Sequence, residues 1–245
     1  MSGVALPGAA ISGVALPLLA VLVSTGCALQ NFDDSPPRHH TKAVELDKSE
    51  IVRVSIKMGA GELSVSGGSP RLLDAVFDFH RLVSEPLVTY HSTGVRGDLT
   101  IEQPSDSGGF KQNHGDYKWD LRLNDRVPMD VVANLGAGEA RMKLGDLTLR
   151  SVEVHMGVGE LNLDLRGNPT RDCDVQIHGG VGEANVYLPA SAAITANAKG
   201  GIGDISVQGL EKRNGRWINP LHEHAAATIH LDVTGGVGSI HLVAE

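Results

Sequence analysis

Carboxylates that directly follow Gly-x-Gly tripeptides are the first side chains in this 245-residue chain whose spacing suggests chemistry. In the C-terminal half they are Glu139, Glu160, Glu183 and Asp204. If the repeats stack, like charges come together in one row and repel. Three arrangements relieve the repulsion: solvated and splayed side chains, pairing with a row of basic residues, or a bound cation. The four acids are therefore weak candidates for a metal site.

A second set of polar residues lies two positions before the first glycine of each tripeptide. Its members are Lys57, Asn134, His155, His178, Lys199 and Thr234. We expect His155, His178 and Lys199 to lie side by side on the outside of consecutive repeats, where they are candidate partners for the acids. Two histidines one repeat apart suit a transition metal, whereas a solvated polar face needs no ligand. We hypothesise that this row binds a glycan or another envelope polymer.

A third candidate region is the insertion LEKRNGRWINPLHEH after Gly209, because loops that leave a regular repeat often carry function. Trp217 beside Arg216 suits stacking on a sugar or a protein partner, or it forms a hydrophobic lid. His222 and His224 are metal-ligand types, but no further ligand is fixed nearby. No serine or cysteine nucleophile has a recognisable catalytic context. We therefore predict a non-enzymatic protein without a cofactor.

The glycine tripeptides recur along the chain and define its elements. They begin at Gly59, Gly136, Gly157, Gly180, Gly201 and Gly236. The steps from 136 to 157, 180 and 201 are 21, 23 and 21 residues, and the step to 236 is 35. Residues alternate between apolar and polar on both sides of each tripeptide, which indicates half-buried strands.

This repeat predicts an all-β fold, a right-handed β-solenoid with one strand-turn-strand coil per repeat of about 21 residues. Glycine is expected at the corners because φ is positive there or because successive corners pack too closely for a Cβ. The residue between the glycines is apolar, and we expect it to fill the core at the corner. These middle residues are Ala137, Val158, Val181, Ile202 and Val237.

Two other glycine-rich motifs fit poorly. A dinucleotide-binding loop needs a third glycine and a following helix, whereas strands follow the glycines here. The calcium-binding nonapeptide β-roll shares the Gly-Gly-x-Gly opening, but its ligand position holds Ala184 or Ile205. Its nine-residue period also differs from the one observed.

Composition restricts the partners. The formal net charge of -8 argues against nucleic acid and against electrostatic docking on anionic lipid. Aromatic residues make up only 4% of the chain, which disfavours an ordinary compact core. Of the two cysteines, Cys173 has no partner once Cys27 is lipidated, and we expect it to be buried and inert.

The N-terminal segment carries export signals. Val14 to Val23 is almost wholly apolar, which suits a signal peptide better than a membrane span. The tetrapeptide Ser24-Thr25-Gly26-Cys27 resembles a bacterial lipobox, with Cys27 as the lipidation site. The alternatives are an uncleaved apolar anchor and an ordinary signal peptide. Ala28 after the cysteine permits, by the same resemblance, transfer to the outer membrane.

We predict four parts: a signal peptide at 1–26, a flexible tether at 27–48, an irregular solenoid part at 49–133 and a regular repeat part at 134–245. The final strand, Ser239 to Ala244, ends almost at the terminus. We expect its edge to be exposed and to offer a contact for a second copy or another partner.

The repeated units resemble the toast-rack domains of bacterial envelope proteins, which are related to Lia-type stress regulators and adhesin-like domains. The resemblance covers about residues 50–245. Its most specific part is Trp217-Ile218-Asn219-Pro220 followed by the strand from Ile229 to Val233 and Gly235-Gly236-Val237-Gly238. It implies a fold but no catalytic residues.

We therefore expect a lipid-anchored protein of the cell envelope that presents solenoid faces to envelope polymers or partner proteins. The alternative is the extracytoplasmic sensor domain of an envelope-stress response.

Overall fold

The computed structural model describes residue 3 and residues 37–79, 84–104, 117–221 and 225–245. Contacts divide the chain into a segment Met1–Asp34 and a compact unit Ser35–Glu245, and everything below concerns the second. The described residues contain no helix long and apolar enough to cross a bilayer.

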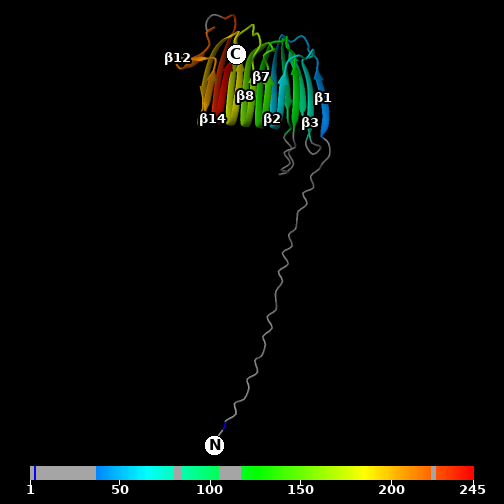
Figure 1. Cartoon of the computed structure of the whole chain (residues 1–245). Helices are drawn as coiled ribbons and strands as arrows, with labels where there is room; N and C mark the ends of the chain where they lie inside the picture. Colours follow the sequence, from blue (N-terminus) through cyan, green and yellow to red (C-terminus); the bar gives the residue numbers. More distant parts are fainter. Residues whose placement is uncertain (1–2, 4–36, 80–83, 105–116, 222–224) are drawn as a thin grey trace. The chain divides into compact units, whose positions relative to one another are not determined.

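The unit is built from strands (Figure 1), which confirms the predicted all-β class. The strands are β1 (Arg38–Val44), β2 (Ile51–Ser66), β3 (Leu73–Phe79), β4 (Leu87–Thr93), β5 (Arg96–Glu102), β6 (Lys118–Leu123), β7 (Met129–Lys143), β8 (Leu149–Asp164), β9 (Cys173–Leu188), β10 (Ala193–Lys199), β11 (Ile205–Gln208), β12 (Glu211–Arg213), β13 (Arg216–Ile218) and β14 (Thr228–Ala244).

Each long strand folds back at its Gly-x-Gly tripeptide, which we call the apex. In β8 the buried positions are Val152, Val154 and Met156 before the apex, and Leu161 and Leu163 after it. The alternation therefore changes phase at the apex, so that both arms turn their apolar side toward a shared core. The fold-back is direct in β14, where a Cβ built on Gly235 lies 3.3 Å from Cδ1 of Ile240.

The apices stack with their backbones in contact, which explains both glycines. The second glycine has φ between 126° and 142° in all six copies. A Cβ on Gly182 would lie 1.8 Å from the carbonyl oxygen of Gly159, and a Cβ on Gly180 would lie 2.4 Å from that of Gly157. The first glycine is thus required by close packing in every copy but Gly59, where a Cβ would meet only the Gln103 side chain at 3.5 Å, and the second glycine is required by close packing and by its φ.

The strand order corrects the expectation that repeats stack in chain order. β2, β7, β8 and β9 are parallel and in register, but the next neighbour is β14, followed by β10 and β11. β14 therefore pairs on both sides, and the C-terminal strand is not the exposed edge that we predicted. On the other side of β2, β5 pairs with the first arm and β6 with the second.

The insertion after Gly209 closes the β10 edge. Asn214 and Gly215 have φ of 48° and 82°, as in the two-residue turn that joins twisted hairpin strands, here β12 and β13. β13 pairs antiparallel with β10 at Thr195 and Ala196. Buried Asn219 fastens the insertion: its Oδ1 accepts the Ile194 N–H at 3.0 Å and its Nδ2 donates to the Ala192 carbonyl at 2.7 Å. The 35-residue step from Gly201 to Gly236 is therefore longer than the others because it contains the added β12–β13 hairpin.

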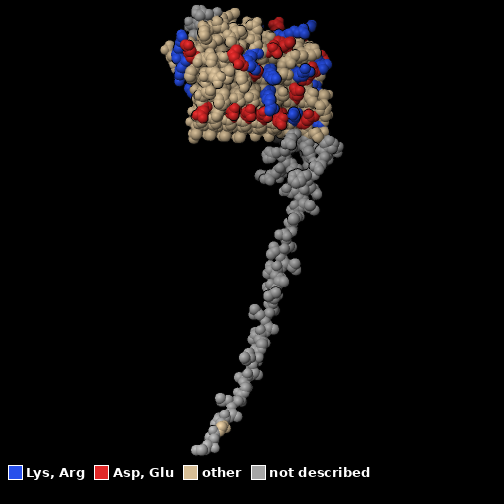
Figure 2. Space-filling view, viewed as in Figure 1, with Lys and Arg blue, Asp and Glu red and all other residues tan. Residues whose placement is uncertain are grey.

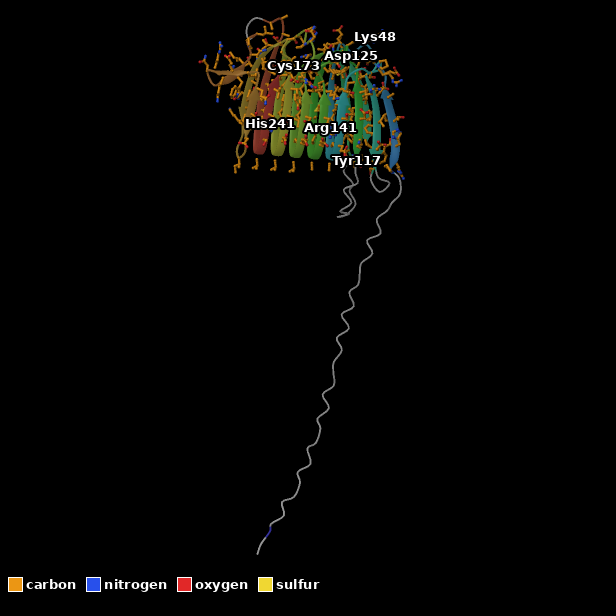
Figure 3. The ribbon with its side chains drawn as sticks, viewed as in Figure 1. Lys48, Tyr117, Asp125, Arg141, Cys173 and His241 are labelled. Atoms are coloured by element: carbon orange, nitrogen blue, oxygen red, sulfur yellow. The ribbon has the colours of Figure 1, made fainter. Side chains whose placement is uncertain are left out.

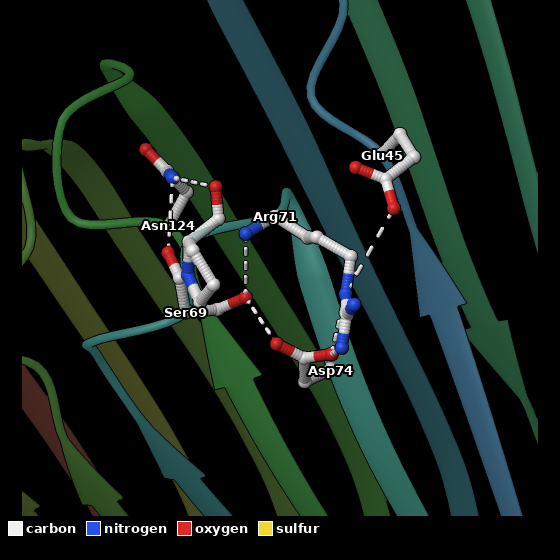
Figure 4. A network of polar contacts seen from close by, with 6 residues as sticks. Glu45, Ser69, Arg71, Asp74 and Asn124 are labelled. Atoms are coloured by element: carbon white, nitrogen blue, oxygen red, sulfur yellow. Dashed lines mark hydrogen bonds and ion pairs between the residues drawn. The ribbon is translucent and has the colours of Figure 1, made fainter.

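The opposite end of the stack is closed by β1, β3 and a polar network (Figure 4). The Ser69 hydroxyl donates to Asp74 at 2.6 Å, and the Arg71 guanidinium pairs with the same carboxylate. The Ser69 hydrogen bond, together with Arg71, holds the pKa of Asp74 below its ordinary value against the opposing effect of burial. Asn124 donates to the Ser69 carbonyl at 3.0 Å and so ties the end of β6 to this turn.

The middle residues of the apices correct a second expectation, because they do not fill the core. The exposed fractions are 54% for Val158, 50% for Val181, 47% for Val237 and 73% for Ile202, and Ala137 is also exposed. At a tight fold-back, the residue at the tip points away from both arms. The tips therefore form a row of solvent-facing apolar side chains along the apical edge.

Candidate functional site

The polar row before the apices lies on the outer face of the first arms. Its spatial order is Lys57, Asn134, His155, His178, Thr234 and Lys199. His155 and His178 are direct cross-strand neighbours, and their rings stack with centroids 5.0 Å apart at 13°. The prediction that these two histidines meet is confirmed. Lys199 does not join them, because β14 places Thr234 between His178 and Lys199.

A shallow open groove of about 670 Å³ runs along this row. Its polar lining comes from Lys57, Gln103, Asn134, His155 and His178, and its apolar lining from Met58, Leu135 and Met156. A straight groove with hydrogen-bonding groups at the regular spacing of a sheet suits an extended polar ligand.

His155 and Lys57 are held by carboxylates on the same face. Nε2 of His155 lies 2.7 Å from Oε1 of Glu153, and Nζ of Lys57 lies 3.3 Å from Oε2 of Glu102. The sequence analysis missed Glu153 although period-two alternation puts it on the face of His155. It also missed Gln103, whose Oε1 accepts the Gly59 N–H at 2.8 Å and the Ala60 N–H at 3.2 Å. The chain separates these partners by 44 residues, so no local pattern points to them.

The acid row lies on the outer face of the second arms, just past the apices, and Figure 2 shows it along the lower edge of the unit. Its order is Glu62, Glu139, Glu160, Glu183, Ser239 and Asp204. Asp204 therefore does not stack directly on Glu183.

The acids take partners on their own face rather than from the row that contains the histidines. Glu139 pairs with Arg141, which Figure 3 labels on this face. Glu62 pairs with Lys118 at 3.3 Å. Glu160 accepts from Asn162 at 2.7 Å and Glu183 from Asn185 at 2.9 Å. The idea that the row before the apices neutralises the acids is wrong, since the two rows lie on opposite arms.

No group of three or more metal-ligand side chains suited to an ion occurs among the residues that the structure describes.

The aromatic residue of the insertion packs inward. Trp217 is half-buried against the hydrophobic core, and Nζ of Lys212 lies 5.3 Å from its ring centroid. This packing favours the interpretation of Trp217 as a hydrophobic lid and not as a platform for stacking on a sugar. Arg216 is exposed beside it. His222, His224 and Cys27 lie outside the described residues.

Cys173 is buried and free, as expected. Burial, with smaller contributions from Asp174 and Asp130, raises the pKa of its thiol to about 12. A thiol of that kind is a poor nucleophile at neutral pH.

More than half of the chain matches a known protein family. Residues 33–187 match the family described as the N-terminal domain of toast_rack, DUF2154. The chain belongs to this toast_rack family. No curated protein shows a significant match to it.

Solved structures extend the toast_rack comparison. A "putative cell adhesion protein" from Clostridium sporogenes is 29% identical with a TM-score of 0.79, over 85% of this chain and 100% of that one. A "putative adhesin" from Bacteroides fragilis has 13% identity, a TM-score of 0.33 and coverages of 84% and 97%. A "putative lipid binding protein" from Parabacteroides distasonis has 12% identity, a TM-score of 0.28 and coverages of 85% and 97%.

Proposed function

We propose that this toast_rack protein is a non-enzymatic, adhesin-like binding module of the cell envelope, lipid-anchored through Cys27. In this proposal the repeats form a right-handed β-solenoid whose polar outer faces bind envelope polymers or partner proteins. The family and the Clostridium sporogenes relative support the adhesin-like class. The lipobox-like Ser24 to Cys27 segment supports the anchor and an envelope location.

The observation that carries the proposal is the groove beside the stacked His155–His178 pair. A binding surface made of in-register strands presents one side chain about every 4.8 Å along the stack, so it can follow an extended polymer over several strands. Met58, Leu135 and Met156 are buried beneath the floor of the groove, so its contact groups are the polar side chains of the row and Gln103. We therefore infer a glycan or glycan-peptide polymer as the ligand class.

Replacing both histidines is the direct test. We expect His155→Ala with His178→Ala to weaken binding to soluble peptidoglycan fragments by roughly tenfold to thirtyfold, because two polar contacts of about 1 kcal/mol each are lost. Isothermal titration with the full mature chain measures the change. Both positions face solvent in part, so the fold should be retained.

The matched control is His39→Ala with His241→Ala. These histidines are also partly exposed, but His39 is on β1 and His241 is on the opposite arm of β14. The control should bind like the wild type. Equal binding by all three proteins would contradict the groove as the site. Mass spectrometry of the mature N-terminal peptide tests the anchor separately, with a diacylglyceryl group on Cys27 as the expected result.

A further inference from the structure

The apical edge carries a row of solvent-facing apolar side chains that the groove does not use. The row, which we call the apical ridge, consists of Ala137, Val158, Val181 and Val237 from β7, β8, β9 and β14, and of Ile202, which lies between β10 and β11 and bridges to Val237. Strands are about 4.8 Å apart, so the ridge is straight and about 20 Å long. Four of these five side chains are β-branched and 47% to 73% exposed, and a continuous apolar row of this kind is a candidate contact surface.

The start of the folded unit lies at this same edge. Arg38 pairs with Phe79, Asp78 pairs with Lys118, and Lys118 pairs with Glu62, which directly follows the β2 apex. β1 therefore begins at the apical edge, where Figure 3 also labels Tyr117, whereas Lys48 and Asp125 are labelled at the opposite edge. Cys27 precedes Arg38 by 11 residues, and such a segment spans at most about 40 Å when fully extended. A lipid on Cys27 would thus tether the unit through its apical edge and keep Arg38 within about 40 Å of the bilayer.

Both sides of the ridge are polar, and one side is strongly acidic. Figure 2 shows the acid row beside a rim without charged groups. Glu139, Glu160 and Glu183 follow the apices directly and so lie just behind the ridge. If the ridge enters the boundary between acyl chains and headgroups, these carboxylates reach headgroup level. There they are favourable beside ammonium groups and unfavourable beside anionic lipid.

We propose that the apical ridge docks on a bilayer of zwitterionic lipid with ammonium headgroups, such as phosphatidylethanolamine. The proposal rests on the lipid anchor of the proposed function, which keeps the ridge near the surface. A second copy of the chain fits the ridge less well, because one side chain's width over about 20 Å is far smaller than the roughly 800 Å² per partner of a stable interface. The flat surface of a bilayer can contact a straight ridge along its whole length. Because the lipid anchor already holds the protein at the membrane, the ridge itself does not need high affinity.

Spin labelling of the full mature chain in vesicles of phosphatidylethanolamine and phosphatidylcholine tests the proposal. A nitroxide at Val181→Cys should be about tenfold less accessible to a water-soluble relaxant than one at Asp146→Cys, an exposed position in the connector between β7 and β8. Native Cys173 is buried and should stay unlabelled. Val158→Ser, Val237→Ser and Ile202→Ser together should abolish the protection while leaving the circular dichroism spectrum unchanged. Vesicles of phosphatidylglycerol in place of the zwitterionic lipids should weaken the protection of the label at position 181.

Equal accessibility of the labels at 181 and 146 in a lipidated chain would overturn the ridge proposal and leave the anchor standing. Spin–spin broadening at 181 that disappears on dilution with unlabelled protein would identify a second copy as the occupant and would also overturn it. A chain without an acyl group on Cys27 contradicts the anchor. Protection at 181 in that chain would support the ridge alone, and its absence there would refute both proposals.

Discussion

Replacing Gly182 with alanine is expected to destabilise the folded unit by at least about 3 kcal/mol, because two costs combine at one atom. The residue has φ of 141°, where an L side chain is strained. Its new Cβ would also lie 1.8 Å from the carbonyl oxygen of Gly159, a backbone atom that cannot rotate away. The strands β8 and β9 would have to separate at the apex. Because each strand of the stack is stabilised by contact with its neighbours, this separation would weaken the adjoining strands as well. Urea unfolding followed by circular dichroism measures the loss.

Gly179→Ala is the matched control, three residues earlier on the same strand. A Cβ there meets no atom within 4 Å, and its φ is not in the left-handed range. The inward position opposite is filled by isoleucine in β11 and β14 but by Ala184 in β9, which leaves room. We expect the control to stay within about 1 kcal/mol of the wild type. Similar stabilities for the two variants would contradict the stacked apices.

Trp119→Ala is expected to cost about 3 to 5 kcal/mol, the range for removing a large aromatic from a packed core. Trp119 is fully buried in β6. Its ring meets Phe77 edge to face with centroids 5.4 Å apart, and Tyr117 with centroids 6.3 Å apart. The large cavity would lie where β3 and β6 close the stack beside β2. Chemical denaturation of the full mature chain gives the free energy of unfolding.

Trp119→Phe separates shape from hydrogen bonding. The indole N–H of Trp119 has no acceptor among the described residues, so its removal breaks no hydrogen bond. We expect phenylalanine to retain most of the stability, with a loss below about 2 kcal/mol from the smaller ring. A loss as large as that of the alanine variant would contradict the expectation that an aromatic ring of similar shape is enough to hold this site.

The sequence predicted the fold class and the role of the glycines because both follow from local rules. Alternation with period two marks half-buried strands wherever it occurs. The packing requirement at Gly157 and Gly159 recurs at the same offset in the other copies, except at Gly59, where a Cβ would meet only the Gln103 side chain.

The strand order could not be read from the repeat, because β9 can pair equally well with any strand that carries the same pattern. The order depends on the path of the β10–β14 connection. One signal was present: Asn214-Gly215 is a strong two-residue hairpin turn. A hairpin laid on the outside of β10 leaves only the inner side of β10 for the next parallel strand, β14.

The positions of site residues were predicted correctly where the residues come from repeats that are consecutive in the chain and also neighbours in space. They were predicted wrongly where another strand lies between the two repeats. His155 and His178 come from β8 and β9, which are neighbours in chain and in space. Lys199 was misplaced by the order of β14 and β10. The apolar character of Val158 and Val181 was noted, but their direction was reversed. At the tip of a fold-back, the backbone geometry directs the side chain toward solvent even when the side chain is apolar.

The order β8, β9, β14, β10 is the central claim, because it fixes how the polar row, the acid row and the ridge continue beyond β9. Oxidative cross-linking of cysteine pairs tests it. His178 and Thr234 are direct partners and face the same side, about 4.8 Å apart, whereas β14 separates His178 from Lys199. We predict a disulfide in His178→Cys with Thr234→Cys and none in His178→Cys with Lys199→Cys. The reverse result would mean that the repeats stack in chain order and would contradict the account.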